Sequence, residues 1–244
     1  MNDQNLTFWG HLDVLRGCLI KIILGVTLGS VVAFCLKDEV FNLVLAPSHD
    51  EFFVYRWMGA ESFSITLVNT GLTEQMLSHI KVAVTVGTLA VSPYIIYVLF
   101  GFISPALYEN ERRYSARLTL AAYLMFMVGV VVNYVLIFPL SFRFLGTYQV
   151  SEEVTNMLTI SSYVDTFMMM TLIFGVVFEI PVLSWLLGRM GLIKAEWMRR
   201  YRRHAFVVIL IVAAFITPTP DALTLFIVSL PIWLLYELSI FLVK

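Results

Sequence analysis

Long apolar runs with almost no charge constrain this sequence more than any other feature. A helix that crosses a bilayer needs about 20 apolar residues, whereas a β-barrel would show alternating segments of about 10 residues. The runs have the helical pattern. We therefore predict an all-α polytopic membrane protein, a single transmembrane domain over residues 1–244, with six transmembrane helices at residues 17–36, 77–100, 117–139, 163–187, 204–217 and 222–243.

The composition agrees with this class. Apolar residues make up 59% of the chain and charged residues only 14%, and the mean hydropathy is +0.85. A soluble domain of the same length would need more charge to cover its exterior. The net charge of −1 also provides no concentrated positive surface for phosphate groups, so we expect no nucleic-acid partner.

The last two predicted spans are separated only by the turn Pro218-Thr219-Pro220-Asp221. Its two prolines remove helical hydrogen-bond donors, and an aspartate is costly within hydrocarbon. We therefore predict that the last two helices are short and form a hairpin, rather than one broken span. In the first span, Gly25, Gly29 and Ala33 recur every four positions, a stripe that permits close helix approach.

The distribution of basic residues orients the spans. With six spans, one side of the membrane receives 12 Lys and Arg residues and the other side receives 4. The positive-inside rule then places both termini in the cytoplasm. The larger group consists of Arg16, Lys21, Arg112, Arg113, Arg117, Arg189, Lys194, Arg199, Arg200, Arg202, Arg203 and Lys244, and the smaller of Lys37, Arg56, Lys81 and Arg143. The outer loop at 37–76 is long enough for a short helical cap but not for an independent domain.

No motif for an enzyme is present. The chain has no Gly-x-Ser-x-Gly, His-Glu-x-x-His, Cys-x-x-Cys or P-loop sequence. Its four histidines lie in different segments, and none has a carboxylate or cysteine at metal-ligand spacing. We therefore expect no catalysis, no metal and no cofactor.

Two acidic residues fall within predicted spans, where an ionisable group usually serves a function. Glu179 precedes Pro181 by two residues and has no basic residue in its own span. It either faces a polar track for a substrate or is a neutral carboxyl that bonds to a neighbouring helix. Glu237 lies nearer the cytoplasmic end of its span, where its side chain can reach water.

The loop between the second and third predicted spans carries a different acidic group. Glu109 and Glu111 lie beside Arg112 and Arg113 in a short cytoplasmic connection. They either form local surface ion pairs, each worth under about 1 kcal/mol, or form a carboxylate site for a cationic ligand. Carboxylates accept a guanidinium group through two parallel hydrogen bonds.

Taken in order, several short motifs resemble those of TatC, the polytopic core subunit of the twin-arginine protein translocase. The resemblance covers essentially the whole chain. It depends on the order of the motifs along the chain, since any one of them alone is weak. The motifs are His11-Leu12, Leu15-Arg16, Ala46-Pro47, Ser92-Pro93, Pro105-Ala106-Leu107-Tyr108, Glu111-Arg112-Arg113, Phe138-Pro139, Phe174-Gly175, Phe178-Glu179-Ile180-Pro181, Thr217-Pro218 with Asp221, and Pro231 followed by Tyr236-Glu237.

This resemblance implies a non-enzymatic receptor for the paired arginines of signal peptides on folded cargo proteins. The family works in the cytoplasmic membrane of prokaryotes with single-span subunits of the TatA and TatB type, and the proton-motive force drives transport. It implies a homo-oligomer in the receptor complex. The signal-peptide site implied here comprises Glu111, Glu109, Asp13, Arg16 and Leu12; the intramembrane polar site is Glu179; and Pro47, Asp221 and Glu237 are outer-loop or structural residues.

One departure from the family pattern concerns the segment before the first span. The family usually has His-Leu-x-Glu-Leu-Arg, whereas this chain has Val14 where the glutamate would stand. Asp13 is one residue earlier, a rotation of about 100° on a helix. Whether Asp13 replaces the missing acid stays open. The alternative function is a proton-coupled small-solute transporter that uses Glu179, although it leaves the Glu111 motif unexplained. A purely structural scaffold leaves the acid within a span unexplained.

Overall fold

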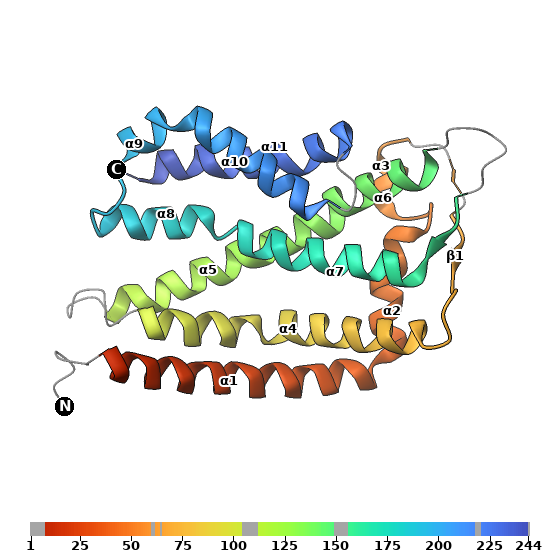
Figure 1. Cartoon of the computed structure of the whole chain (residues 1–244), viewed down its shortest axis with the longest axis horizontal. Helices are drawn as coiled ribbons and strands as arrows, with labels where there is room; N and C mark the ends of the chain where they lie inside the picture. Colours follow the sequence, from red (N-terminus) through yellow and green to blue (C-terminus); the bar gives the residue numbers. More distant parts are fainter. Residues whose placement is uncertain are drawn as a thin grey trace.

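The structure of this protein is a computed structural model that describes residues 8–59, 62–63, 65–103, 112–148, 156–217 and 221–243. The described residues form a bundle of helices with a small cap at one end (Figure 1). Helix α1 begins and helix α11 ends at the same end of the bundle, which we call the proximal end. The cap lies at the opposite, distal end. The predicted all-α membrane fold is confirmed.

Helix α1 (Phe8–Cys35) packs almost entirely on α4 (Glu74–Ile103). Glycines let the two backbones approach closely, because a Cβ added at Gly29 would lie 2.8 Å from the carbonyl oxygen of Gly87. A Cβ added at Gly25 would likewise lie 3.1 Å from Cγ1 of Val91. The small-residue stripe predicted in the first span therefore does mediate close packing. The rest of α1 exposes apolar side chains, as a lipid-facing helix does.

The third predicted span is longer than expected and is not a uniform α-helix. Helix α5 (Arg112–Val132) continues through a π-helical turn (Asn133–Ile137) into α6 (Phe138–Thr147). Pro139 lies near the start of α6, where its missing N–H costs one intrahelical hydrogen bond. The apolar stretch therefore reaches from Arg117 to Thr147 instead of ending at residue 139.

The fourth span is broken in two. Helix α7 (Ile160–Val177) ends just before Phe178, and α8 (Ile180–Arg189) begins after Glu179. Pro181 has no N–H to donate to the carbonyl one turn earlier, so the helical hydrogen bonds are interrupted there. The break places Glu179 at the N-terminal end of α8, as its N-cap residue, rather than in the middle of a continuous helix.

The last two spans form the predicted hairpin, but only one of them is short. Helix α10 (Arg202–Ile216) has 15 residues, a length of about 22 Å, which is less than the roughly 30 Å hydrocarbon core. Helix α11 (Ala222–Leu242) has 21 residues and is long enough to cross it. The prediction that both are short is therefore wrong for α11. Five helical stretches of the described chain meet the length and hydropathy of a membrane span, and α10 is the sixth, shorter one.

The proximal connection between α8 and α10 contains the short helix α9 (Ala195–Arg200). Gly191, which follows α8, has a φ of 73°, a left-handed conformation that glycine adopts without steric cost. This turn reverses the chain so that α9 and α10 can pack against α11. Tyr236 of α11 holds α9 in place by donating a hydrogen bond to the carbonyl oxygen of Met198 at 2.8 Å.

The outer loop forms the predicted short helical cap. It contains α2 (Lys37–Leu45), a 3-10 helix (Ala46–Ser48) and α3 (Phe53–Trp57), followed by strand β1 (Leu67–Val68). Strand β1 pairs in parallel with β2 (Leu158–Thr159), which lies directly before α7. The sequence did not predict these strands, because two residues are too few for a recognisable pattern. They join the cap to the distal end of α7 (Figure 1).

Candidate functional site

The residues predicted to bind a signal peptide divide into two groups. Leu12, Asp13 and Arg16 lie on the first turns of α1 at the proximal end, and all three are exposed. Glu109 and Glu111 lie outside the described residues. The described part of the site thus presents an exposed acidic side chain, Asp13, and an exposed basic one, Arg16, at the start of α1.

Glu179 lies at the break between α7 and α8, inside the bundle. Both carboxyl oxygens are buried, and among the described residues neither has a hydrogen-bond partner. The neighbouring Phe178 belongs to the main core cluster, and it packs so closely on α5 that a Cβ added at Gly129 would lie 2.8 Å from its Cβ. A buried polar group that lacks a partner is costly and calls for an explanation beyond packing.

A buried polar contact joins the π-helical turn after α5 to α7. Asn133, which opens the π-helical turn after α5, is fully buried and donates a hydrogen bond from Nδ2 to Oγ1 of Thr171 in α7 at 3.0 Å. This pair was not predicted from the sequence. The amide side chain of Asn133 within the predicted span at 117–139 does indicate a polar partner on another helix, since such a group is seldom left without a partner in a membrane.

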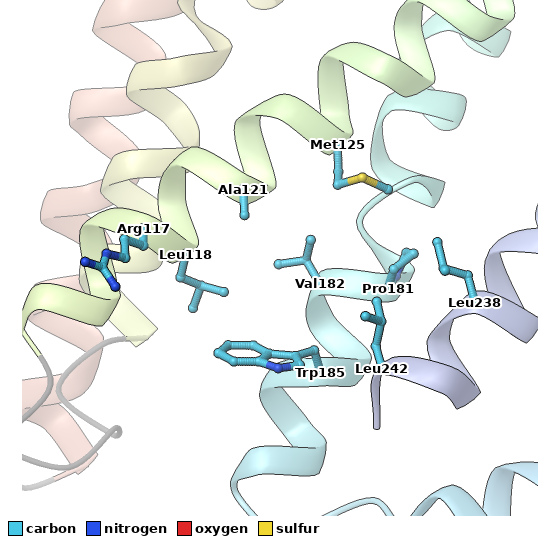
Figure 2. A pocket seen from close by; sticks show the side chains of 9 residues that line it. All are labelled: Arg117, Leu118, Ala121, Met125, Pro181, Val182, Trp185, Leu238 and Leu242. Atoms are coloured by element: carbon cyan, nitrogen blue, oxygen red, sulfur yellow. The ribbon is translucent and has the colours of Figure 1, made fainter. Parts of the chain in front are cut away.

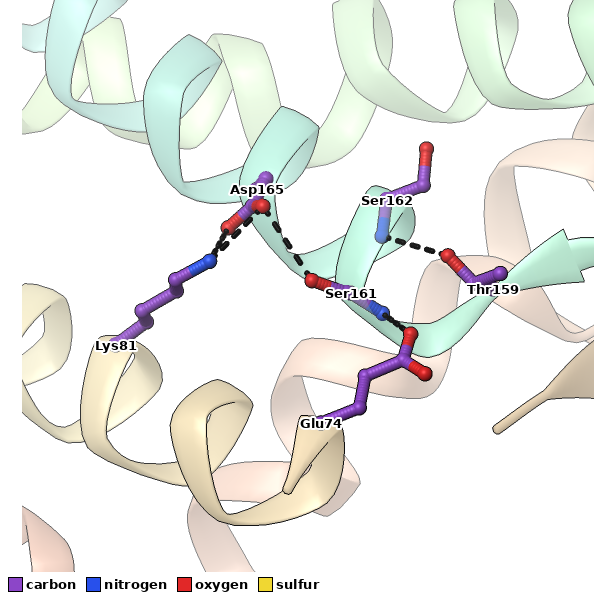
Figure 3. Close-up of polar contacts among 6 residues, drawn as sticks. All are labelled: Glu74, Lys81, Thr159, Ser161, Ser162 and Asp165. Carbon is purple, nitrogen blue, oxygen red and sulfur yellow. Dashed lines mark hydrogen bonds and ion pairs between the residues drawn. The ribbon is translucent and has the colours of Figure 1, made fainter. Parts of the chain in front are cut away.

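An ion pair between α4 and α7 was also missed. Lys81 Nζ lies 2.6 Å from Oδ1 and 2.9 Å from Oδ2 of Asp165 (Figure 3). Both residues fall inside the predicted spans, near the distal end of each. Opposite charges at matched depths in two predicted spans therefore indicate such a pair, beyond the place of Lys81 among the basic residues of the outer side.

Glu74, about two turns before Lys81 on α4, connects the same two helices nearer the cap. Its Oε2 accepts hydrogen bonds from the backbone N–H groups of Thr70 and Gly71, each at 2.9 Å. Its Oε1 accepts one from the N–H of Ser161 at the start of α7, at 3.1 Å (Figure 3). A carboxylate at this position satisfies a free N–H and complements the positive end of the helix dipole. Glu74 and the Lys81–Asp165 pair together hold α4 beside α7 at the distal end.

Neutralising one member of the Lys81–Asp165 pair is expected to destabilise the protein more than neutralising both. Lys81→Met or Asp165→Leu alone leaves one charge without its partner. Because both side chains are about half exposed, we expect a coupling of about 1 kcal/mol. That corresponds to roughly 2–4 °C in the unfolding midpoint of a chain of this size. Thermal unfolding of both single variants and the double variant in detergent measures it, and strictly additive losses would show that the pair is not coupled.

The remaining predicted residues have local partners. Glu237 of α11 forms an ion pair with Arg202 at the start of α10, with 2.6 Å between Oε2 and Nη2. Asp221 caps α11, since its side chain accepts a hydrogen bond from the N–H of Thr224 at 2.7 Å. The Glu237–Arg202 pair joins α10 to α11 at the proximal end, and the Asp221 cap stabilises the start of α11.

Pro47 is buried in the cap at the distal end. Its carbonyl oxygen lies 2.8 Å from the hydroxyl of Tyr55, which is also 3.1 Å from the carbonyl oxygen of Pro139 at the start of α6. Burial raises the pKa of Tyr55 above its ordinary value, so its hydroxyl stays protonated and can donate. Through Tyr55, the segment around Pro47 is fastened to α6.

A groove lies among α5, α8 and α11 toward the proximal end (Figure 2). Its volume is about 370 Å³, and its walls are almost wholly apolar. Helix α5 contributes Arg117, Leu118, Ala121 and Met125, and the other two helices contribute Pro181, Val182, Trp185, Leu238 and Leu242. None of the sequence predictions had singled out these residues as a group.

Comparison with known proteins gives consistent results. Residues 10–231 match the family model described as Sec-independent protein translocase protein (TatC). A protein of that name from Deinococcus radiodurans is 34% identical over 231 residues, which cover 94% of this chain and 83% of the relative. The protein of that name from Carboxydothermus hydrogenoformans is 29% identical over 244 residues, which cover 100% of this chain and 95% of the relative.

Solved structures agree with the sequence matches. A crystal structure of the twin-arginine translocase receptor TatC superposes with a TM-score of 0.80 and 31% sequence identity, over 95% of this chain and 97% of that one. A second structure of that receptor, in DDM, superposes with a TM-score of 0.82 over 96% of this chain and 99% of the other. The likeness thus extends over nearly the whole length of both molecules.

Proposed function

Because this chain belongs to the TatC family of Sec-independent protein translocase proteins, we propose that it is the receptor that recognises twin-arginine signal peptides. The protein is a multi-pass membrane component of the twin-arginine translocase. The resemblance drawn from the motifs is therefore confirmed. The observation that carries the proposal is the match over residues 10–231, together with a receptor structure that superposes at 31% identity.

The proposed receptor acts without catalysis. It lies in the cytoplasmic membrane of a prokaryote with both termini in the cytoplasm, so that the proximal end of the bundle faces the cytosol. It binds the signal peptides of folded cargo proteins and assembles, as several copies, with single-span subunits of the TatA and TatB type. The proton-motive force drives the export step. The split of 12 against 4 basic residues between the two sides supports this orientation.

The peptide site in this proposal combines Glu111 and Glu109 of the loop with Leu12, Asp13 and Arg16 at the start of α1. Loop and helix meet the cytosol on the same side of the membrane in the predicted topology. Two guanidinium groups need carboxylates that are exposed and held at a fixed spacing. The exposure of Asp13 supports its inclusion.

Replacing Glu111 with glutamine is expected to weaken the binding of a twin-arginine peptide. A charge-assisted contact of this kind contributes about 1.5–3 kcal/mol, so affinity should fall by roughly tenfold to a hundredfold. Crosslinking or titration of the purified protein with a twin-arginine peptide, compared with a twin-lysine peptide, measures this change. Asp13→Asn is tested beside it, and normal binding by that variant would assign recognition to the loop acids alone.

The matched control is Glu196→Gln, which removes an exposed acid from α9 at the same end of the bundle. It should bind the peptide normally, so that a loss in Glu111→Gln cannot be attributed to net charge. Unchanged peptide binding by Glu111→Gln would remove Glu111 from the site. The alternative of a proton-coupled small-solute transporter is not favoured, because the family and the structural neighbours are protein translocase components.

A further inference from the structure

We propose that the groove among α5, α8 and α11 binds one acyl chain of an anionic phospholipid, with the lipid phosphate beside Arg117. This inference rests on the groove itself and does not depend on signal-peptide recognition. The depth of the groove along the bundle, its apolar walls and the positive charge at its mouth support this assignment.

The groove opens where apolar helices reach the membrane boundary. Arg117 is the first residue of the apolar stretch that continues to Thr147, and Leu242 ends the apolar stretch of α11. Helix α8 ends at Arg189 on the same side of the bundle. The groove thus lies at the depth of lipid chains, and its mouth lies at the depth of the headgroups.

The walls suit a hydrocarbon chain. Leu118 and Met125 of α5 face Val182 of α8 and Leu238 of α11 across the space (Figure 2). The small side chain of Ala121 keeps the space open between them. A volume of about 370 Å³ is within the range of about 300–1,000 Å³ that small-molecule pockets have. In a bilayer, lipid chains are the apolar molecules present at the highest concentration beside such a groove.

The mouth carries positive charge. Arg117 lies at the edge of the groove, and its guanidinium points away from the apolar side chains (Figure 2). Trp185 lines the groove as well, and the Arg189 guanidinium lies 5.4 Å from the centre of its ring. Among the described residues that line the groove, none is acidic. Basic pockets between spans on the cytoplasmic side recognise anionic headgroups, and a guanidinium matches a phosphate geometrically.

The same charges argue against a signal peptide in this groove. The proposed peptide carries a pair of arginines, which Arg117 would repel. An anionic lipid, in contrast, brings a phosphate to Arg117 and a chain to the apolar walls. Charge complementarity therefore favours the lipid over the peptide.

The experiment uses the purified full-length protein in detergent with phosphatidylglycerol or phosphatidylcholine of identical acyl chains. Native mass spectrometry measures bound lipid, and thermal unfolding measures stabilisation. The wild type should retain phosphatidylglycerol at least about tenfold better than phosphatidylcholine and show a higher midpoint with it, since a ligand that binds only the folded state stabilises that state. Arg117→Gln should lose the preference between the two lipids. Ala121→Trp, which fills the groove, should lose most of the binding of both.

Arg203→Gln is the matched control, because it removes an exposed arginine at the same end but outside the groove. It should keep the wild-type preference. Equal binding of both lipids by the wild type, a preserved preference in Arg117→Gln, or displacement of the lipid by a twin-arginine peptide would each overturn the proposal. Since Arg117 is exposed, its glutamine variant should fold even if Ala121→Trp does not. Neither readout requires transport, so the result is independent of the proposed receptor function.

Discussion

Replacing Gly87 with alanine is expected to lower the thermal unfolding midpoint of this protein, because α4 has no room for a methyl group where it crosses α1. An added Cβ would lie 2.6 Å from the carbonyl carbon of Gly29 and 2.6 Å from Cα of Ser30. These are backbone atoms, so the helices must move apart. Overpacking of this kind costs about 1–3 kcal/mol, and each kcal/mol corresponds to roughly 2–4 °C at this chain length. Helix α1 has almost no other packing partner among the described elements.

Helix α4 supplies its own control. A Cβ added at Gly101 meets no described atom within 4 Å. Gly101→Ala should therefore leave the midpoint unchanged or raise it, since alanine favours a helix over glycine by up to about 1 kcal/mol. Thermal unfolding of both variants in the same detergent makes the comparison. Equal midpoints for the two variants would mean that the close crossing of α1 and α4 does not contribute to stability.

The second large effect is expected at Glu179. We expect Glu179→Ala to impair export of a folded twin-arginine cargo after the signal peptide has bound, whereas Glu179→Gln keeps substantial assembly and transport. The buried carboxyl has no hydrogen-bond partner among the described residues, so its polar group is available to a passing chain or a partner helix. Glutamine preserves the shape and most of the hydrogen bonding, and alanine preserves neither. Export assays and peptide crosslinking, performed on the same membranes, separate the two steps.

The matched control is Glu237→Gln, which changes the other acid found within a predicted span. Glu237 is paired with Arg202 and partly exposed, so we expect binding and export close to wild type. A Glu179→Ala variant that exports at the normal rate would show that its carboxyl is dispensable. A variant that already fails to bind peptide would place Glu179 in recognition or folding instead of in a later step.

Much of the fold could be predicted because membrane insertion depends on each segment separately. A span is stable when its own residues are apolar enough, so the hydropathy pattern predicted the helices that cross the membrane. The turn at Pro218 and Pro220 likewise predicted the α10–α11 hairpin, and Pro181 lies where the fourth span breaks. These features depend on local chemistry. The ends of the helices were less accurate, since α5 continues through a π-helical turn into α6 with no change in hydropathy.

Side-chain partnerships between helices could not be predicted in the same way. Lipid chains are as apolar as leucine, so the sequence has little pattern to show which face of a span meets another helix. The Lys81–Asp165 pair joins positions 84 residues apart, and the β1–β2 pairing joins segments about as distant. Both depend on how the helices rotate and approach one another.

The sequence by itself therefore determined the class, the spans, their predicted orientation and the family, because each is encoded in local hydrophobicity, charge and short motifs. Only the tertiary structure decided which polar groups have partners. It buries the carboxyl of Glu179 without a described partner, pairs Asn133 with Thr171, and leaves an apolar groove beside Arg117. The physical reason is that burial and contact are properties of helix packing, and packing depends on the combined shape of several helices rather than on any one of them.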